Sequence, residues 1–204
     1  MEQIQNQPSM PYPQPNYSVV GRPMMPFWTA VKTCFRKYFD FTGRARRSEY
    51  WWFVLFYMLV SMAWIFLSTF FIFAGFEAFS ANEGAMFTTI LTSMAFMIVP
   101  ILIFIIPYYA AQTRRLHDSG HSGWWIVASF VVSLVYLGVY IALMKPVFNF
   151  ESGPNFSENL SPTLLVLVSI LSIISMVLSI VILVFTILDS ERGENKYGPS
   201  PKYQ

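Results

Sequence analysis

The sequence has few charged residues: Asp, Glu, Lys and Arg make up 12% of its 204 residues, whereas 55% are hydrophobic. A soluble domain of average composition has about 25% charged residues. This composition excludes a soluble α/β enzyme and a chain that is disordered throughout. Because Cys34 is the single cysteine, no internal disulfide can form, which excludes a disulfide-stabilised scaffold. An integral membrane protein remains.

Charge is absent from four long stretches, which contain no Asp, Glu, Lys, Arg or His. They are residues 51–76, 85–112, 124–144 and 163–188. A helix needs about 20 residues to cross the bilayer core, and each stretch is long enough. The sequence therefore predicts an all-α, polytopic membrane protein built as a four-transmembrane-helix bundle.

The basic residues are distributed unequally between the two sides of these spans. Of the 13 Lys and Arg residues, only Lys145 lies in the segments that follow the first and third spans. The other basic residues precede the first span, lie between the second and third, or follow the fourth. The positive-inside rule then predicts that both termini are in the cytoplasm.

The residues before the first span divide into two parts. Residues 1–26 are rich in Pro, Gln and Asn, which predicts a disordered cytoplasmic tail. Residues 27–204 form the predicted membrane domain. Its first part is amphipathic, because residues from Phe27 to Phe39 place their apolar side chains on one helical arc. This pattern predicts a helix on the inner membrane surface; the alternative is a helix packed against the end of the bundle.

The spans contain no ionisable side chains other than tyrosine, which argues against a proton- or ion-coupled transporter. Pro100 and Pro107 interrupt the second span and either kink it or form a broken-helix site. A row of serines on the fourth span forms either a packing seam or a polar lining. This row consists of Ser169, Ser172, Ser175 and Ser179. A small oligomeric channel or transporter therefore stays an alternative.

Three polar motifs flank the spans on the predicted cytoplasmic side. They read FDFTGRARRSEYWWF from Phe39, RRLHDSGHSGWW from Arg114 and GENKYGPSP from Gly193. Two of them contain a tryptophan pair at or next to their last residue; such pairs favour the head-group region and are predicted membrane-interface anchors. These anchors are Trp51, Trp52, Trp124 and Trp125.

The three motifs, in this order, resemble the bacterial inner-membrane proteins of the YhaH/YhaI type, a domain family of unknown function. The resemblance covers residues 35–201 approximately. It implies a multi-pass protein of the bacterial cytoplasmic (inner) membrane with a compact four-helix domain. It implies no activity, and it does not explain the Pro-rich N-terminal tail.

The polar motifs supply a candidate binding face on the cytoplasmic side. Its residues are Arg44, Arg46, Arg47, Glu49, Arg114, Arg115, His117, Asp118, His121 and Asn195. One interpretation is mutual structural pairing, with the two acids bound to arginines. The other is a site for an anionic ligand, because arginines outnumber acids there.

The string His117–Asp118–His121 is the only pattern typical of metal-dependent chemistry. A third His or a nearby Cys is missing, so we predict no metal, cofactor or catalytic residue. The predicted function is a non-catalytic module that binds anionic lipid head groups or a membrane or cytoplasmic protein. A membrane-embedded enzyme that uses the histidine loop is a second alternative. No nucleic-acid partner is expected, and the oligomeric state stays open.

Overall fold

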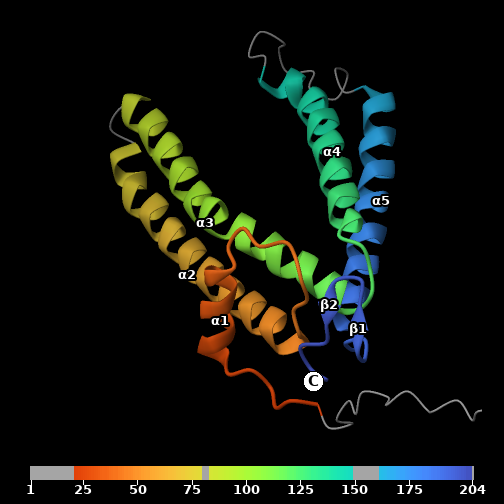
Figure 1. Cartoon of the computed structure of the whole chain (residues 1–204). Helices are drawn as coiled ribbons and strands as arrows, with labels where there is room; N and C mark the ends of the chain where they lie inside the picture. The colour runs from red at the N-terminus through yellow and green to blue at the C-terminus, as the bar shows by residue number, and fades with distance from the viewer. Residues whose placement is uncertain (1–20, 80–82, 149–160, 204) are drawn as a thin grey trace, which may run out of the picture.

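The computed structural model describes residues 21–79, 83–148 and 161–203 (Figure 1). Five helices follow one another in these ranges and precede a short antiparallel strand pair. The elements are α1 (Phe27–Arg36), α2 (Arg47–Phe79), α3 (Glu83–Asp118), α4 (Trp124–Phe148), α5 (Pro162–Ile187), β1 (Glu194–Asn195) and β2 (Gly198–Pro199).

The four long helices α2 to α5 are apolar enough and long enough to cross a membrane, which confirms the all-α, four-span prediction. They form two hairpins, because α2 packs against α3 and α4 packs against α5. The hairpins meet where α3 contacts α5, near β1 and β2, and diverge toward the other end (Figure 1). Large apolar side chains such as Phe66 and Leu102 cover their outer surface, as expected for helices surrounded by lipid.

The two prolines lie inside α3, and each removes a helical hydrogen bond. Pro100 has no N–H to donate to the carbonyl of Phe96, four residues earlier. The indole Nε1 of Trp64 in α2 donates to that carbonyl at 2.8 Å, and the two aromatic rings stack 4.4 Å apart. A free carbonyl is costly in lipid, so Pro100 gives α2 a polar attachment point on α3.

Pro107 frees the carbonyl of Ile103 in the same way. The hydroxyl of Tyr38, which follows α1, donates to this carbonyl at 2.8 Å. Pro107 itself is fully buried. The second proline therefore attaches the segment after α1 to the side of α3.

Three of the four serines in the row on α5 do not form the predicted packing seam within the described chain. Ser169, Ser172 and Ser179 are exposed, and their hydroxyls donate at 2.8–2.9 Å to carbonyls of α5 itself. In an apolar environment a hydroxyl can be satisfied by its own helix backbone, so no cross-helix partner is required. The prediction of a hydroxyl seam is wrong for these three residues.

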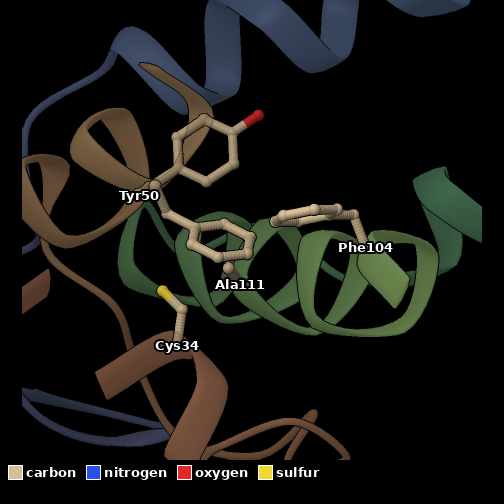
Figure 2. Close-up of a cluster of buried hydrophobic side chains, with 5 residues drawn as sticks. Cys34, Tyr50, Phe104 and Ala111 are labelled. Atoms are coloured by element: carbon tan, nitrogen blue, oxygen red, sulfur yellow. The ribbon is translucent and has the colours of Figure 1, made fainter. Parts of the chain in front are cut away.

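The predicted amphipathic helix is present as α1, but the centre of its apolar arc does not face the membrane. Val31 and Cys34 are buried against α2 and α3, whereas Trp28 stays 63% exposed. Figure 2 shows Cys34 from α1 facing a cluster that contains Tyr50 from α2 and Phe104 from α3. The alternative, a helix packed against the end of the bundle, is correct for this part of α1.

We expect Cys34 to be unreactive in the folded protein. It is fully buried, and burial in apolar surroundings raises the pKa of its thiol to about 12. Near neutral pH almost no thiolate is then available to react. Maleimide labelling of the native, detergent-purified protein should be negligible, and labelling in denaturant should reach one equivalent.

The control places a cysteine at the exposed position Lys196 in a Cys34→Ala background, and this variant should label rapidly in the native state. Native labelling of Cys34 at a comparable rate would contradict the packing of α1.

Candidate functional site

The polar cap is the end of the molecule at which the two hairpins meet, and we define it as residues 40–49, 114–121 and 188–200. Its central element is the last turn of α3, which extends past the predicted span and ends at Asp118. Gly120 has a φ of +80°. The amides of Gly120 and His121 donate to the carbonyls of His117 and Leu116 at 3.2 and 2.9 Å. This is a Schellman ending, and it requires a residue in the left-handed region.

The carboxylate of Asp118 is fully buried and pairs with two arginines. Its Oδ1 accepts from Nε of Arg44 at 3.0 Å, and its Oδ2 accepts from Arg115. The hydroxyl of Ser190 also donates to Oδ2. Asp118 therefore joins the segment before α2, the end of α3 and the chain that follows α5.

Arg44 also binds the backbone of the C-terminal segment. Its Nη atoms donate to the carbonyls of Glu191, Gly193 and Gly198 at 2.7, 2.9 and 3.1 Å. Together with the carboxylate of Asp118, these carbonyls accept hydrogen bonds from all three nitrogens of the Arg44 guanidinium. Arg44 thus fixes the strand pair β1–β2 against α3.

Arg115 closes the C-terminal end of α5. Its Nε donates to the carbonyl of Thr186 at 2.9 Å, and Nη2 donates to the carbonyl of Leu188. A helix has unpaired carbonyls and a negative partial charge at this end, which a cation stabilises. Because Arg115 belongs to α3, this contact attaches one hairpin to the other.

Arg114 connects the first hairpin to α1. Its Nη2 lies 3.3 Å from Oε1 of Glu49 in the first turn of α2. Its Nη1 donates to the carbonyls of Lys37, at 3.2 Å, and Asp40, which follow α1. The carbonyl of Arg114 also accepts from the amide of Ala45 at 2.9 Å.

These contacts correct the predicted binding face. Six of its ten residues are buried, so they do not belong to one exposed surface. The buried six are Arg44, Glu49, Arg114, Arg115, His117 and Asp118. The physical reason is that each of the three buried arginines forms an ion pair with a carboxylate and donates hydrogen bonds to carbonyls of the chain itself. The structural-pairing interpretation predicts this arrangement. Arg46, Arg47, His121 and Asn195 stay wholly or partly accessible.

The two histidines lie against different aromatic rings and do not converge on one point. His117 stacks on Tyr197 with a centroid distance of 3.7 Å, and its Nδ1 is 3.1 Å from the carbonyl oxygen of Gly43. His121 stacks on Phe185 at 3.6 Å. Within the described residues, no group of three His, Cys, Asp or Glu is arranged to hold a metal ion.

Asn195 fixes the short strand pair to α3. Its Nδ2 donates to the carbonyl of His117 at 3.0 Å and to Oε2 of Glu191 at 2.7 Å. Its Oδ1 accepts from the amide of Tyr197 at 2.9 Å, which forms the turn between β1 and β2. This arrangement holds Tyr197 over the imidazole of His117.

The accessible basic residues border a groove beside the polar cap, which we call the basic groove. Its volume is about 410 Å³. It is lined by the basic side chains of Arg22, Arg46, Arg47 and Lys202, by the apolar side chains of Met24, Trp51, Trp52 and Leu55, and by Ser48. Sequence reasoning identified the arginine and tryptophan pairs but missed the residues on the N-terminal segment and the C-terminal tail. Their distance along the chain gives no signal that they meet.

The predicted interface anchors lie at the polar-cap ends of their helices. Trp124 begins α4 and is 74% exposed, and Trp51 and Trp125 are exposed as well. Trp52 is partly covered, and its ring contacts Phe27 edge-on at 5.7 Å. Their position at head-group depth stays a prediction.

Asp189 holds the C-terminal tail next to the basic groove. It pairs with Lys202 at 2.7 Å and, more loosely, with Arg47 at 3.8 Å. Partial burial acts against ionisation, but hydrogen bonds from Lys202, the Ser190 amide and Tyr203 lower the pKa of Asp189 to about 2. Its charge therefore persists above that pH, and the contribution to stability is lost as the pH falls through about 2.

We expect Asp118→Asn to destabilise the protein by about 3 kcal/mol, because the buried arginines then lose their counter-ion. The midpoint of unfolding in an SDS titration, followed by labelling of Cys34, measures this change. The matched control is Asp189→Asn, which removes a half-exposed carboxylate and should cost less than about 1 kcal/mol. Equal shifts for both variants would contradict a special role for the buried carboxylate.

Comparison with known proteins assigns the chain to a family. The chain is 32% identical over 128 residues to the inner membrane protein YhaH of Escherichia coli strain K12, covering 62% of this chain and 88% of the relative. The same values hold for YhaH of Escherichia coli O157:H7. No solved structure matches the chain. The model of a family described as "Protein of unknown function (DUF805)" matches residues 38–199, a range that contains all of the polar cap except Ser200. The chain therefore belongs to this family, whose relative YhaH is an inner membrane protein.

Proposed function

We propose that this membrane-embedded protein is a non-catalytic module that binds anionic lipid head groups through the accessible basic residues of its polar-cap end. The observation that carries the proposal is the division of the arginines. Arg44, Arg114 and Arg115 are buried and occupied by the protein itself. A second set of basic residues at the same end stays wholly or partly accessible. This set is Arg22, Lys32, Arg36, Lys37, Arg46, Arg47, Arg192, Lys196 and Lys202.

The polar-cap end is the cytoplasmic end in this proposal. All basic residues except Lys145, which lies at the far end of α4, belong to the polar-cap end or to the segments around it. The positive-inside rule supports this orientation for both termini. Anionic lipids of the cytoplasmic leaflet attract basic residues near the membrane surface by about 1 kcal/mol for each residue.

The competing functions have less support from the geometry. A broken-helix site in a channel or transporter needs backbone carbonyls that are free to contact the substrate. The carbonyls freed by Pro100 and Pro107 instead accept hydrogen bonds from side chains of the protein. For an enzyme, the imidazoles of His117 and His121 are stacked on aromatic rings, and the carboxylate between them is paired with arginines. Binding of a protein partner to the same basic residues is the nearest alternative to lipid binding.

Lipid analysis of the purified protein tests the proposal. We expect the protein extracted in mild detergent to retain anionic phospholipids above their share in the bulk membrane. Replacing Lys32, Arg36, Arg46 and Arg47 with Gln should reduce this enrichment toward one, because the long-range attraction falls with each charge removed.

Lys145→Gln serves as a control, since it removes a charge from the opposite end and should leave the enrichment unchanged. Retained lipid with the composition of the bulk membrane, already in the unaltered protein, would overturn the proposal. Retention of a stoichiometric protein in its place would favour the partner alternative.

Reporter fusions test the proposed orientation. Green fluorescent protein at the C-terminus should fluoresce, because both termini are expected in the cytoplasm. Alkaline phosphatase inserted at Asn155, between α4 and α5, should be active, because the enzyme folds only outside the cytoplasm. Two fusions that report the same side would contradict the proposed topology.

A further inference from the structure

The basic groove is assembled from three segments that are far apart in the sequence. The amide of Arg22 donates to the carbonyl of Lys202 at 2.9 Å, and the amide of Met25 donates to Oγ of Ser48 at 3.1 Å. These bonds hold the N-terminal segment between the C-terminal tail and the start of α2. Arg22 and Lys202 lie outside the range that the family model matches, so the match covers only part of the groove.

The groove is positively charged and contains guanidinium groups with unused donors. Among the described residues no acidic side chain lines it, and the adjacent Asp189 pairs with Lys202 and, at 3.8 Å, with Arg47. Arg22 and Arg46 form no ion pair within the part of the chain that the structure describes. The Nη2 of Arg46 donates to the carbonyls of Arg22 and Pro23 at 2.9 and 2.6 Å, which fixes the side chain and leaves Nε and Nη1 for another acceptor.

Arg47 is held in place in a similar way. Its Nε donates to the carbonyl of Leu188 at 2.9 Å, and its Nη2 is 3.8 Å from Oδ1 of Asp189. Guanidinium groups held in this way can bind a phosphate group, which arginine does through two parallel hydrogen bonds.

The other lining residues are apolar and lead into the membrane. Trp51 and Trp52 belong to the first turns of α2, where tryptophan favours head-group depth. Leu55 follows one turn deeper and is 40% exposed, and Met58 and Leu59 continue this exposed apolar path along α2. An occupant of the groove therefore meets cations at the head-group level and an apolar helix surface below them.

From this geometry we infer that the basic groove binds one anionic phospholipid of the membrane that the chain spans. The phosphate lies between Arg22, Arg46 and Arg47, and one acyl chain follows α2 past Leu55. The inference rests on the proposed function and deepens it, because it replaces general attraction to the membrane by a defined site. The occupant belongs to the phospholipids with net negative head groups, such as phosphatidylglycerol or cardiolipin.

Native mass spectrometry of the full-length protein in detergent, titrated with phosphatidylglycerol, tests the inference. One lipid should bind before any others, and phosphatidylcholine should bind far more weakly. The variant R46Q/R47Q should weaken the first binding step about 25-fold, at about fivefold for each guanidinium. R22Q should weaken it about fivefold; the Arg22 guanidinium has no ion-pair partner among the described residues, so a folding defect is not expected.

The matched control is K32Q/R36Q, which removes two exposed charges from α1 at the same end but outside the groove. This variant should bind the first lipid as the unaltered protein does. Equal weakening in the control and in R46Q/R47Q would overturn the defined site while leaving the proposed function intact. Equal binding of phosphatidylglycerol and phosphatidylcholine by the unaltered protein would overturn both. Displacement of the lipid by inorganic phosphate would overturn the assignment of a lipid to the groove.

Discussion

The buried carboxylate of Asp118 is the interaction on which the arrangement of the two hairpins depends. It binds Arg44 from the segment before α2 and Arg115 from its own helix, and it accepts from Ser190 after α5. A buried charge without partners is costly, so such a carboxylate tolerates few alternative arrangements. The helices diverge away from this end (Figure 1), and the polar cap therefore does much to set their relative positions.

Below the cap, side chains of the protein itself occupy the backbone carbonyls that the prolines free. The two prolines of α3 free two carbonyls, and Trp64 and Tyr38 occupy them. The hydroxyl groups of Ser169, Ser172 and Ser179 donate to carbonyls of their own helix α5. These polar groups in the spans attach neighbouring segments to one another or bond to the backbone of their own helix. The candidate binding residues therefore lie at the polar-cap end.

At that end, the basic residues divide into a buried group and an accessible group. Arg44 and Arg115 are buried and bind backbone carbonyls and the carboxylate of Asp118. Through these bonds the two arginines stabilise helix ends and turns. Arg46 and Arg47, only two or three residues after Arg44, face the basic groove. Arg44 and Arg46 both precede α2, and their partners separate them: Arg44 binds the buried carboxylate of Asp118, whereas Arg46 donates to the carbonyls of Arg22 and Pro23 on the N-terminal segment. A binding role for the second group is compatible with a structural role for the first.

The sequence by itself determined the four spans, because charge-free stretches of helical length have few other stable states than a transmembrane helix. It also indicated the helical character of α1 and the pairing of Asp118 and Glu49 with arginines. Only the tertiary structure decided which arginines are buried, since Arg44, Arg46 and Arg47 are chemically alike and differ only in direction. It alone brought Arg22 and Lys202 to one groove, because contacts between distant segments depend on the packing of the helices between them.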